Sequence, residues 1–176
     1  MIITLGDARA IDDSITQDDL DALEAACRSL TNNKFQNRHI RFKEIEFVGT
    51  NLIAIQDPIV GLKVGDTIEV NYSHYNDGLF VIEEIAGKQI KVQGTPFIVA
   101  NTGGSMLTLV QYPADIARGI KKLIAYDKKM ASKIGIKSES ISRMSITYYD
   151  VNASENIDGY PASLLSFLTK YEKMRW

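Results

Sequence analysis

The sequence predicts an α+β protein: a small helical bundle of three main helices, interrupted by an inserted antiparallel β module (a small barrel or roll). Apolar residues recur at three- and four-residue spacing near both ends of the chain, which is the period of an amphipathic helix. Between Ile40 and Tyr112 the period becomes two, and turn residues separate the apolar runs. We therefore expect a discontinuous helical core, residues 1–37 and 111–176, around a β module, residues 38–110.

The first long helix is expected over residues 17–31. Thr16 is a suitable N-cap, because its hydroxyl can accept a hydrogen bond from an otherwise unpaired N–H of the first turn. Asp18 and Asp19 place negative charge where the helix dipole favours it. One stripe of the helix is apolar and comprises Leu20, Leu23, Ala26, Cys27 and Leu30. The first 24 residues carry seven acidic side chains against one arginine, so this end of the chain is strongly acidic.

Six strands are expected in the β module, at residues 41–48, 52–56, 66–72, 79–85, 89–93 and 106–110. Turn signals such as Asn76-Asp77-Gly78 separate them, and their short, regular spacing is typical of a meander. Another turn signal, Gly103-Gly104-Ser105, is not accompanied by a G-x-G-x-x-G or G-K-S/T pattern. We therefore interpret it as a loop tip rather than a phosphate-binding loop.

The longest helix is expected from Tyr112 to Ile134. Pro113 fits the first helical position, and Gly135 is a natural stop after the last turn. The apolar face comprises Ile116, Ile120, Leu123, Ile124 and Met130. The opposite face is basic and comprises Arg118, Lys121, Lys122, Lys128, Lys129 and Lys133. The main functional question is what this basic face contacts.

Two further elements are expected after the long helix. Residues 143–149 alternate like a strand, which could pair with a strand of another copy of the chain. Pro161 then opens a last helix, whose apolar positions are Leu164, Leu165, Phe167, Leu168 and Tyr171. The chain ends in a basic segment with two aromatic residues, Lys170–Trp176. Trp176 could anchor in a partner's groove or fold back on its own core.

Length and composition limit the class of protein. The 176 residues suit one domain, or one domain with a sizeable insertion. A formal net charge of −2 argues against a protein whose whole surface binds nucleic acid. Cys27 is the only cysteine, which excludes an internal disulfide. The first residues do not resemble a signal peptide, and no apolar run approaches the ~20 residues of a membrane span. We expect a soluble protein, intracellular when made, with no membrane partner.

Few residues are suited to catalysis or to metal binding. His39 and His74 are the only histidines, and no Cys or His pair has the spacing of zinc ligands. The acidic pairs are adjacent in sequence, so the two carboxylates of each pair point in different directions: Asp12-Asp13, Asp18-Asp19 and Glu83-Glu84. Cys27 lies on an apolar stripe, which predicts a buried, unreactive thiol. We therefore expect no enzyme activity, no catalytic residue, no metal site and no cofactor.

Several short stretches carry a resemblance to a known family. They are Lys137-Ser138-Glu139-Ser140 leading to Ser145-Ile146-Thr147-Tyr148, the Tyr160–Tyr171 segment, and the Tyr-Pro start of the long helix. Together with the acidic first helix, this order resembles the head-tail connector proteins of long-tailed bacteriophages, also called head-completion or neck adaptor proteins. Gly65–Val70 and Asn76–Ile82 are similar to small β modules of phage neck and tail proteins. Many members of the family are nearly all helical, so a β module of this length departs from the family pattern.

The resemblance implies a structural virion protein, located in the neck at the head-tail interface and, during assembly, in the host cytoplasm. It implies a homo-oligomeric ring, typically a dodecamer, that joins the portal protein of the capsid to the next neck protein, a stopper or tail terminator. It also implies that genomic DNA passes through the channel of the ring without sequence specificity.

A closed ring requires two different, complementary faces on each subunit. We expect the subunit interface to combine acidic residues of the first helix, basic residues of the long helix and residues of the following strand: Asp18, Asp19, Asp21, Glu24, Lys121, Lys122, Lys128, Lys129, Ser145, Thr147 and Tyr149. We expect the end of the chain to bind the portal through Lys170, Tyr171, Lys173, Met174, Arg175 and Trp176.

Three alternatives stay open at this point. A nucleic-acid-binding regulator could use the basic helix over residues 112–134, and its DNA binding would depend strongly on salt. A tail-terminator or stopper protein could carry the same β module. A hydrolase would need a deep pocket with convergent polar groups at the mouth of that module.

Overall fold

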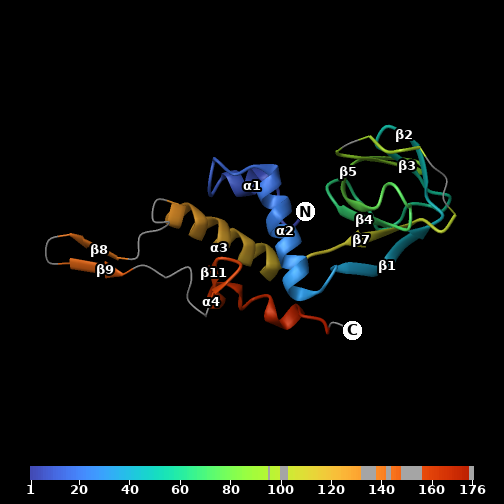
Figure 1. Ribbon diagram of the computed structural model, residues 1–176. Coiled ribbons are helices and arrows are strands. Elements are labelled where there is room, and N and C mark those ends of the chain that lie inside the picture. Colours follow the sequence, from blue (N-terminus) through green and yellow to red (C-terminus); the bar gives the residue numbers. More distant parts are fainter. Residues whose placement is uncertain (95, 100–102, 132–137, 142–143, 148–155, 175–176) are drawn as a thin grey trace. The chain divides into compact units, whose positions relative to one another are not determined.

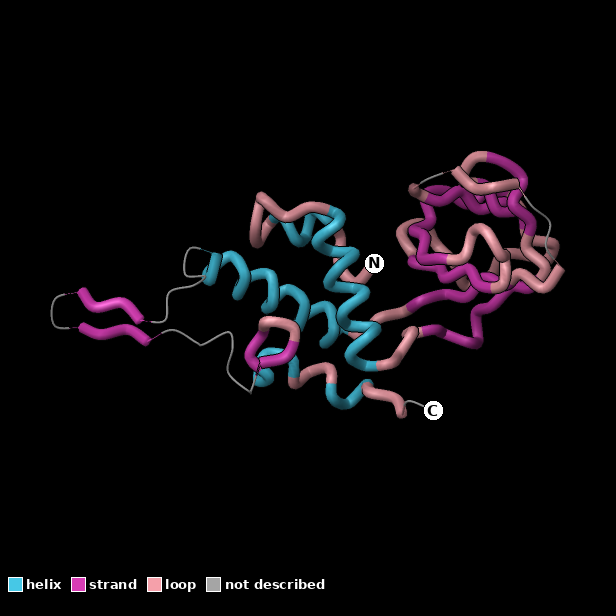
Figure 2. The backbone as a smooth tube through the Cα atoms, in the orientation of Figure 1, coloured by secondary structure: helices cyan, strands magenta, loops and turns pink. Residues whose placement is uncertain are grey.

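The computed structural model describes residues 1–94, 96–99, 103–131, 138–141, 144–147 and 156–174. The chain forms two compact units, which are drawn in Figures 1 and 2. A β unit contains Met1 and Lys34–Gln111, and a helical unit contains Ile2–Asn33 and Tyr112–Trp176. The helical unit is thus built from two segments that the β unit separates in the sequence.

The β unit is a seven-stranded antiparallel sheet with the order β1-β7-β4-β5-β6-β3-β2 (Figure 1). Its strands are β1 (Gln36–Lys43), β2 (Glu46–Gly49), β3 (Leu52–Ala54), β4 (Thr67–Asn71), β5 (Gly78–Ala86), β6 (Gln89–Val92) and β7 (Met106–Val110). Successive strands form the pairs β2-β3, β4-β5 and β5-β6. The pairs β1-β7, β4-β7 and β3-β6 join strands that are distant in sequence, so the sheet depends on long-range pairing as well as on local turns.

The two edge strands of the sheet, β1 and β2, follow one another in the chain. Between them, Glu44 has a left-handed backbone with a φ of 54°, and its N–H donates to the Ser105 carbonyl oxygen at 2.8 Å. The Ser105 hydroxyl donates to the Ile45 carbonyl oxygen at 2.6 Å. These bonds turn the chain from one edge of the sheet to the other. The single strand expected over residues 41–48 is therefore wrong, because two strands form there.

All seven strands contribute side chains to one apolar core, around which the sheet curves (Figure 2). The core comprises Phe42, Ile45, Phe47, Ile53, Ile55, Ile68, Val70, Ile82, Ile90, Val92, Phe97 and Leu107. Successive side chains of a strand point to opposite faces, so alternate residues of each strand enter this core. Phe97 packs edge-on against Phe47 and Phe80, with ring centroids 4.9 and 5.0 Å apart.

The helical unit contains α1 (Leu5–Arg9), α2 (Gln17–Thr31), α3 (Ala114–Met130), α4 (Ala162–Leu165) and a 3-10 turn at Thr169–Tyr171. The helix expected over residues 17–31 is confirmed as α2, and it starts with a capping box. The Thr16 hydroxyl accepts from the Asp19 N–H at 3.3 Å, and the Asp19 carboxylate accepts from the Thr16 N–H at 2.8 Å. α3 lies within the helix expected from Tyr112 to Ile134, of which residues 132–134 are outside the described ranges.

An apolar core of its own holds the helical unit together. Side chains of α2, of α3 and of the C-terminal segment, which we define as residues 162–174, converge there: Leu23, Ala26, Cys27, Leu30, Ile120, Leu123, Leu165 and Leu168. Gly119 of α3 allows this segment to approach closely, because a Cβ at that position would lie 2.3 Å from carbons of the Phe167 ring. The C-terminal segment therefore packs directly on the backbone of α3.

Two small antiparallel sheets lie outside the seven-stranded sheet. β8 (Ser138–Ile141) pairs with β9 (Met144–Thr147), and β10 (Asn156–Ile157) pairs with β11 (Tyr160–Pro161). The strand expected over residues 143–149 thus forms over residues 144–147, and its partner β8 belongs to the same chain. Among the residues that the structure describes, no third strand pairs with β8 or β9.

The predicted fold class, a bundle of three main helices interrupted by a small barrel or roll, is wrong. The seven-stranded antiparallel sheet is the main element, and of the helices described only α2 and α3 exceed five residues. The expected third helix does not form as one α-helix. After Leu165 the backbone N–H groups donate to carbonyl oxygens three residues earlier, which is the 3-10 pattern: Leu168 donates to Leu165, and Tyr171 donates to Leu168. No helix within the described ranges is long and apolar enough to cross a membrane.

Candidate interaction surfaces

The acidic residues expected at a subunit interface have two different environments on α2. Asp18 and Asp21 are exposed, and so is Asp19, whose carboxylate closes the capping box; these hydrogen bonds lower the pKa of Asp19. Glu24 is only 5% exposed and accepts a hydrogen bond from the Tyr112 hydroxyl at 2.8 Å. Burial and the Glu24 charge raise the pKa of Tyr112, so this hydroxyl stays a donor. Glu24 therefore stabilises the helical unit from within, whereas Asp18 and Asp21 lie on its surface.

The basic residues expected at the same interface lie along α3: Lys121, Lys122, Lys128 and Lys129. Lys121 forms an ion pair with Asp7 at 3.4 Å, and the Lys128 ammonium donates to the Ile11 carbonyl oxygen at 2.7 Å. Lys122 and Lys129 are exposed, and neither pairs with an acidic side chain in the described part of the chain. The segment around α1 thus engages two of the four lysines and leaves the other two at the surface.

The strand residues of the predicted interface follow α3. Ser145 and Thr147 belong to β9, whereas Tyr149 lies outside the described residues. In the predicted portal-binding tail, Arg175 and Trp176 also lie outside the described residues. The structure therefore places the backbone of Ser145 and Thr147 on an antiparallel hairpin next to β8.

Two residues of the predicted tail are bound to the start of α3. The Tyr171 hydroxyl donates to an Asp115 carboxylate oxygen at 2.7 Å, and the Lys170 ammonium forms an ion pair with the same carboxylate. The contact with Lys170 lowers the pKa of Asp115 most, and the hydrogen bond from Tyr171 lowers it further. The Asp115 carboxylate in turn raises the pKa of Lys170 and of Tyr171. Both residues are therefore engaged within their own subunit.

The backbone of the same segment is bound to the C-terminal end of α2. The Lys173 N–H donates to the Thr31 carbonyl oxygen at 2.8 Å, and the Asn32 side chain donates to the Met174 carbonyl oxygen at 3.0 Å. The side chains of Lys173 and Met174 remain exposed. The segment consequently presents these two side chains from a fixed backbone.

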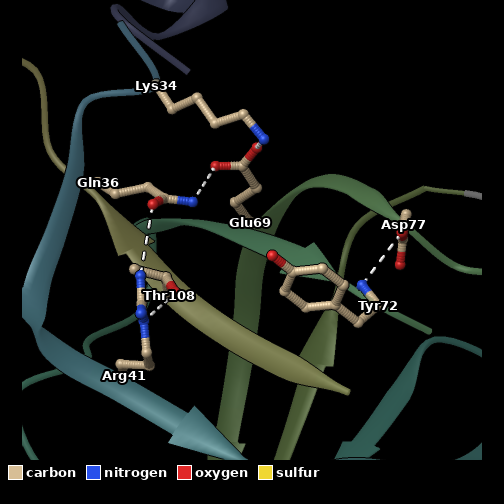
Figure 3. Close-up of polar contacts among 7 residues, drawn as sticks. All are labelled: Lys34, Gln36, Arg41, Glu69, Tyr72, Asp77 and Thr108. Carbon is tan, nitrogen blue, oxygen red and sulfur yellow. Dashed lines mark hydrogen bonds and ion pairs between the residues drawn. The ribbon is translucent and has the colours of Figure 1, made fainter. Parts of the chain in front are cut away.

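Polar side chains on the neighbouring strands β1, β7 and β4 contact one another (Figure 3). Glu69, which is 6% exposed, accepts from the Gln36 side chain at 2.8 Å and pairs with Lys34 at 3.4 Å. The Arg41 guanidinium donates to the Thr108 hydroxyl at 3.0 Å. The buried Glu69 and Thr108 thus have partners, as buried polar groups in stable folds do. We interpret the cluster as a structural network that ties β1 to its neighbours.

A further surface lies on two loops of the β unit, residues 72–77 and 97–99, which we call the tip loops. Four large side chains on them are more than half exposed: Tyr72, Tyr75, Ile98 and Val99. Clustered exposed apolar side chains mark a contact surface on many soluble proteins. The turn signal at residues 76–78 predicts a turn at this position, but it does not by itself indicate that the neighbouring tyrosines form a surface.

The described residues offer little for metal binding or nucleophilic chemistry. Within those ranges, no group of three or more His, Cys, Asp or Glu side chains is placed to hold a metal ion. Cys27 is buried, as predicted, and desolvation raises the pKa of its thiol to about 11. Because the thiolate is the reactive form, this cysteine is unreactive at neutral pH.

No protein-family model and no curated protein matches this sequence. Within the described residues, the surfaces that the contacts of the chain leave available to partners include the charged faces of α2 and α3, the C-terminal segment and the tip loops.

Proposed function

We propose that this chain is a structural protein of the neck of a long-tailed bacteriophage. It assembles into a homo-oligomeric ring that joins the portal protein to the next neck protein, and genomic DNA passes through the channel of the ring. The protein acts by assembly, without catalysis or a cofactor. The proposal combines the resemblance of residues 1–37 and 111–176 to head-tail connector proteins with one observation on the helical unit.

That observation is the separation of charge between two helices. Asp18 and Asp21 are exposed on α2, Lys122 and Lys129 are exposed on α3, and these four residues do not pair with one another. A closed ring needs two complementary faces on each subunit, and opposite charge on two helices meets this requirement. Since an exposed ion pair contributes about 0–1 kcal/mol, these charges determine register and partner choice more than affinity.

The β8-β9 hairpin supports the same proposal. An isolated two-stranded hairpin is only marginally stable in water, and in the described part of the chain β8 and β9 pair only with each other. An unpaired strand edge can bind a strand of another chain through backbone hydrogen bonds. We propose that β9, with Ser145 and Thr147, forms the second contact between successive subunits.

The C-terminal segment is proposed to bind the portal. Its exposed Lys173 and Met174 lie on a backbone that Thr31 and Asn32 hold in place. A segment that is already fixed loses less conformational entropy on binding than a free tail does. This arrangement therefore favours attachment through a pre-formed surface.

Cryo-electron microscopy of the purified chain mixed with its portal tests the proposal. A ring of this chain seated on the portal is the expected result. A chain that stays monomeric and ignores the portal would refute the proposal. Monomeric DNA binding with a steep salt dependence would instead support a nucleic-acid-binding regulator.

Charge reversal tests the interface between α2 and α3. One variant carries Asp18→Lys and Asp21→Lys, and a second carries Lys122→Glu and Lys129→Glu. Neither variant should form rings on the portal by itself, because like charges then face one another. An equimolar mixture should form rings, since the reversed α2 of one variant faces the reversed α3 of the other. Glu84→Lys, at an exposed position of β5, is the control and should assemble normally. Rings from each variant alone would exclude this interface.

A further inference from the structure

We infer that the β unit contacts the β unit of a second copy of this chain, head to tail. The tip loops of one copy bind residues 57–64 of the next, which we call the valine loop. This inference goes beyond the proposed function, which places the subunit contacts in the helical unit. It rests on the shape and chemistry of two surfaces, the tip loops and the valine loop, which lie toward opposite ends of β4.

The first tip loop is held rigid by hydrogen bonds within it. The Asp77 carboxylate accepts from the Tyr72 N–H at 3.1 Å, from the Ser73 N–H at 2.7 Å and from the Ser73 hydroxyl at 2.6 Å. The Ser73 hydroxyl oxygen also accepts from the Asn76 N–H at 2.9 Å. Ser73 and Asn76 are buried, so the bond between these two residues is shielded from water.

The second tip loop is joined to the first by one side chain. The Asn76 amide donates to the Ile98 carbonyl oxygen at 2.8 Å and accepts from the Ile98 N–H at 2.9 Å. The preceding residue, Phe97, is buried and packs against the aromatic core of the sheet. The two loops therefore form one pre-organised surface, which loses little conformational freedom when a partner binds.

This framework displays large side chains to solvent. Tyr72 and His74 have left-handed backbones, with φ of 64° and 66°, a conformation that costs a non-glycine residue roughly 1–2 kcal/mol. The side chains of Tyr72 and Tyr75 are 67% and 68% exposed, and those of Ile98 and Val99 are also exposed. Strain of this kind persists only where the surrounding structure imposes it, and it concentrates at functional sites.

The chemistry of the tip loops fits a protein partner. The two loops contain no lysine or arginine and one aspartate, so they lack the cations that bind nucleic acid or an anionic membrane. The first tip loop contains tyrosine, serine and asparagine, which are enriched in loops that bind protein surfaces, because tyrosine gives a large contact area at low entropic cost. Tyrosine faces also attract lysine or arginine. The fitting partner thus presents apolar groups beside a cation.

The valine loop of this chain is such a surface. Val60 and Val64 are 73% and 61% exposed, and between them the exposed Lys63 provides the cation. The loop is anchored from the other side, because Ile59 and Leu62 pack against the core of the sheet. It therefore offers two apolar side chains and a positive charge from a fixed backbone.

The positions of the two surfaces require a contact between copies. β4 begins at Thr67, three residues after the last residue of the valine loop, and its last residue, Asn71, directly precedes the first tip loop. Two surfaces at opposite ends of one strand cannot meet within a single β unit. Between copies they form a heterologous contact, which closes into a ring or continues as a filament.

Cross-linking of the full chain tests this inference. The double variant Tyr75→Cys, Val60→Cys places one thiol at the centre of each surface, and a short bismaleimide then joins neighbouring thiols. The double variant should give a ladder of cross-linked species, both as free protein at high concentration and on the portal. The two variants that carry only one of these substitutions should not, and they also measure any reaction of the buried Cys27. Tyr75→Cys paired with Glu84→Cys is the matched control, because Glu84 is exposed on β5 outside both surfaces. Adding Lys63→Glu to the double variant should weaken the ladder.

The outcomes separate this inference from the proposed function. A ladder without rings on the portal supports the contact and refutes the neck assignment. Rings on the portal without a ladder overturn the contact and leave the neck assignment in place. Cross-linking of Tyr75→Cys to the portal in place of a second copy also overturns it.

Discussion

Substitution of Gly119 by alanine tests how the C-terminal segment packs on α3. The added Cβ would lie 2.3 Å from two carbons of the Phe167 ring and 2.5 Å from a third, well inside van der Waals contact. Overpacking of this kind typically costs about 1–3 kcal/mol. Alanine in place of glycine favours the helix by about 1 kcal/mol. The clash at 2.3 Å outweighs the gain in helix propensity, so we expect Gly119→Ala to lower the free energy of unfolding by up to about 2 kcal/mol.

A double-mutant cycle separates the clash from the helix propensity. In a Phe167→Ala background the ring is absent, so Gly119→Ala should raise the free energy of unfolding by about 1 kcal/mol. Urea unfolding followed by far-ultraviolet circular dichroism measures all four variants. The sign of the alanine effect should therefore reverse between the two backgrounds. If Gly119→Ala stabilises the protein while Phe167 is present, the close approach of the two elements is wrong.

Three other substitutions test local contacts. Asp115 has a lowered pKa, so its stabilising contribution is present above the ordinary aspartate pKa of about 3.9 and is lost as the pH falls through the folded-state value. Asp115→Asn should make the free energy of unfolding less sensitive to acid in urea titrations; an unchanged acid dependence would exclude this role. Thr16→Ala removes the capping box and should lower the free energy of unfolding by about 1 kcal/mol in the same assay, whereas no loss would count against the cap. Burial raises the pKa of Asp127, and the Tyr160 hydroxyl, which donates to it at 2.5 Å, lowers it. Tyr160→Phe should therefore raise the pKa of Asp127 further in an NMR titration, and a fall would contradict the contact.

Elements with signals inside a short stretch of sequence could be predicted. α2 begins after Thr16 and ends at Thr31, just before the left-handed Asn32, close to where the cap and the apolar stripe place its ends. α3 likewise follows Pro113 and buries Ile116, Ile120, Leu123 and Ile124 of its predicted apolar face, whereas Met130 is only partly buried. These predictions succeed because a helix start, its stripe and its stop are set by residues within a few turns of one another.

Elements that depend on distant residues could not be predicted in this way. The apolar spacing after Pro161 fits one continuous α-helix. The segment instead forms a four-residue helix and a 3-10 turn, which pack against α2 and α3. The run over residues 41–48 reads as one strand, and its division depends on hydrogen bonds between Glu44, Ile45 and Ser105. Sequence periodicity carries no information on these long-range bonds.

The candidate surfaces show the same division. Asp18 and Glu24 are both acidic residues of α2, and their sequence context predicts an interface role for both. Only the fold places the Tyr112 hydroxyl, 88 residues away in sequence, within hydrogen-bond distance of Glu24. The tip loops depend on Asn76 and Ile98, which are 22 residues apart and meet only when the sheet has formed. Charge and helix pattern are therefore properties of the sequence, since neighbouring residues set them. Which charges are buried and which side chains share a surface follow from tertiary contacts, because burial depends on segments far apart in the chain.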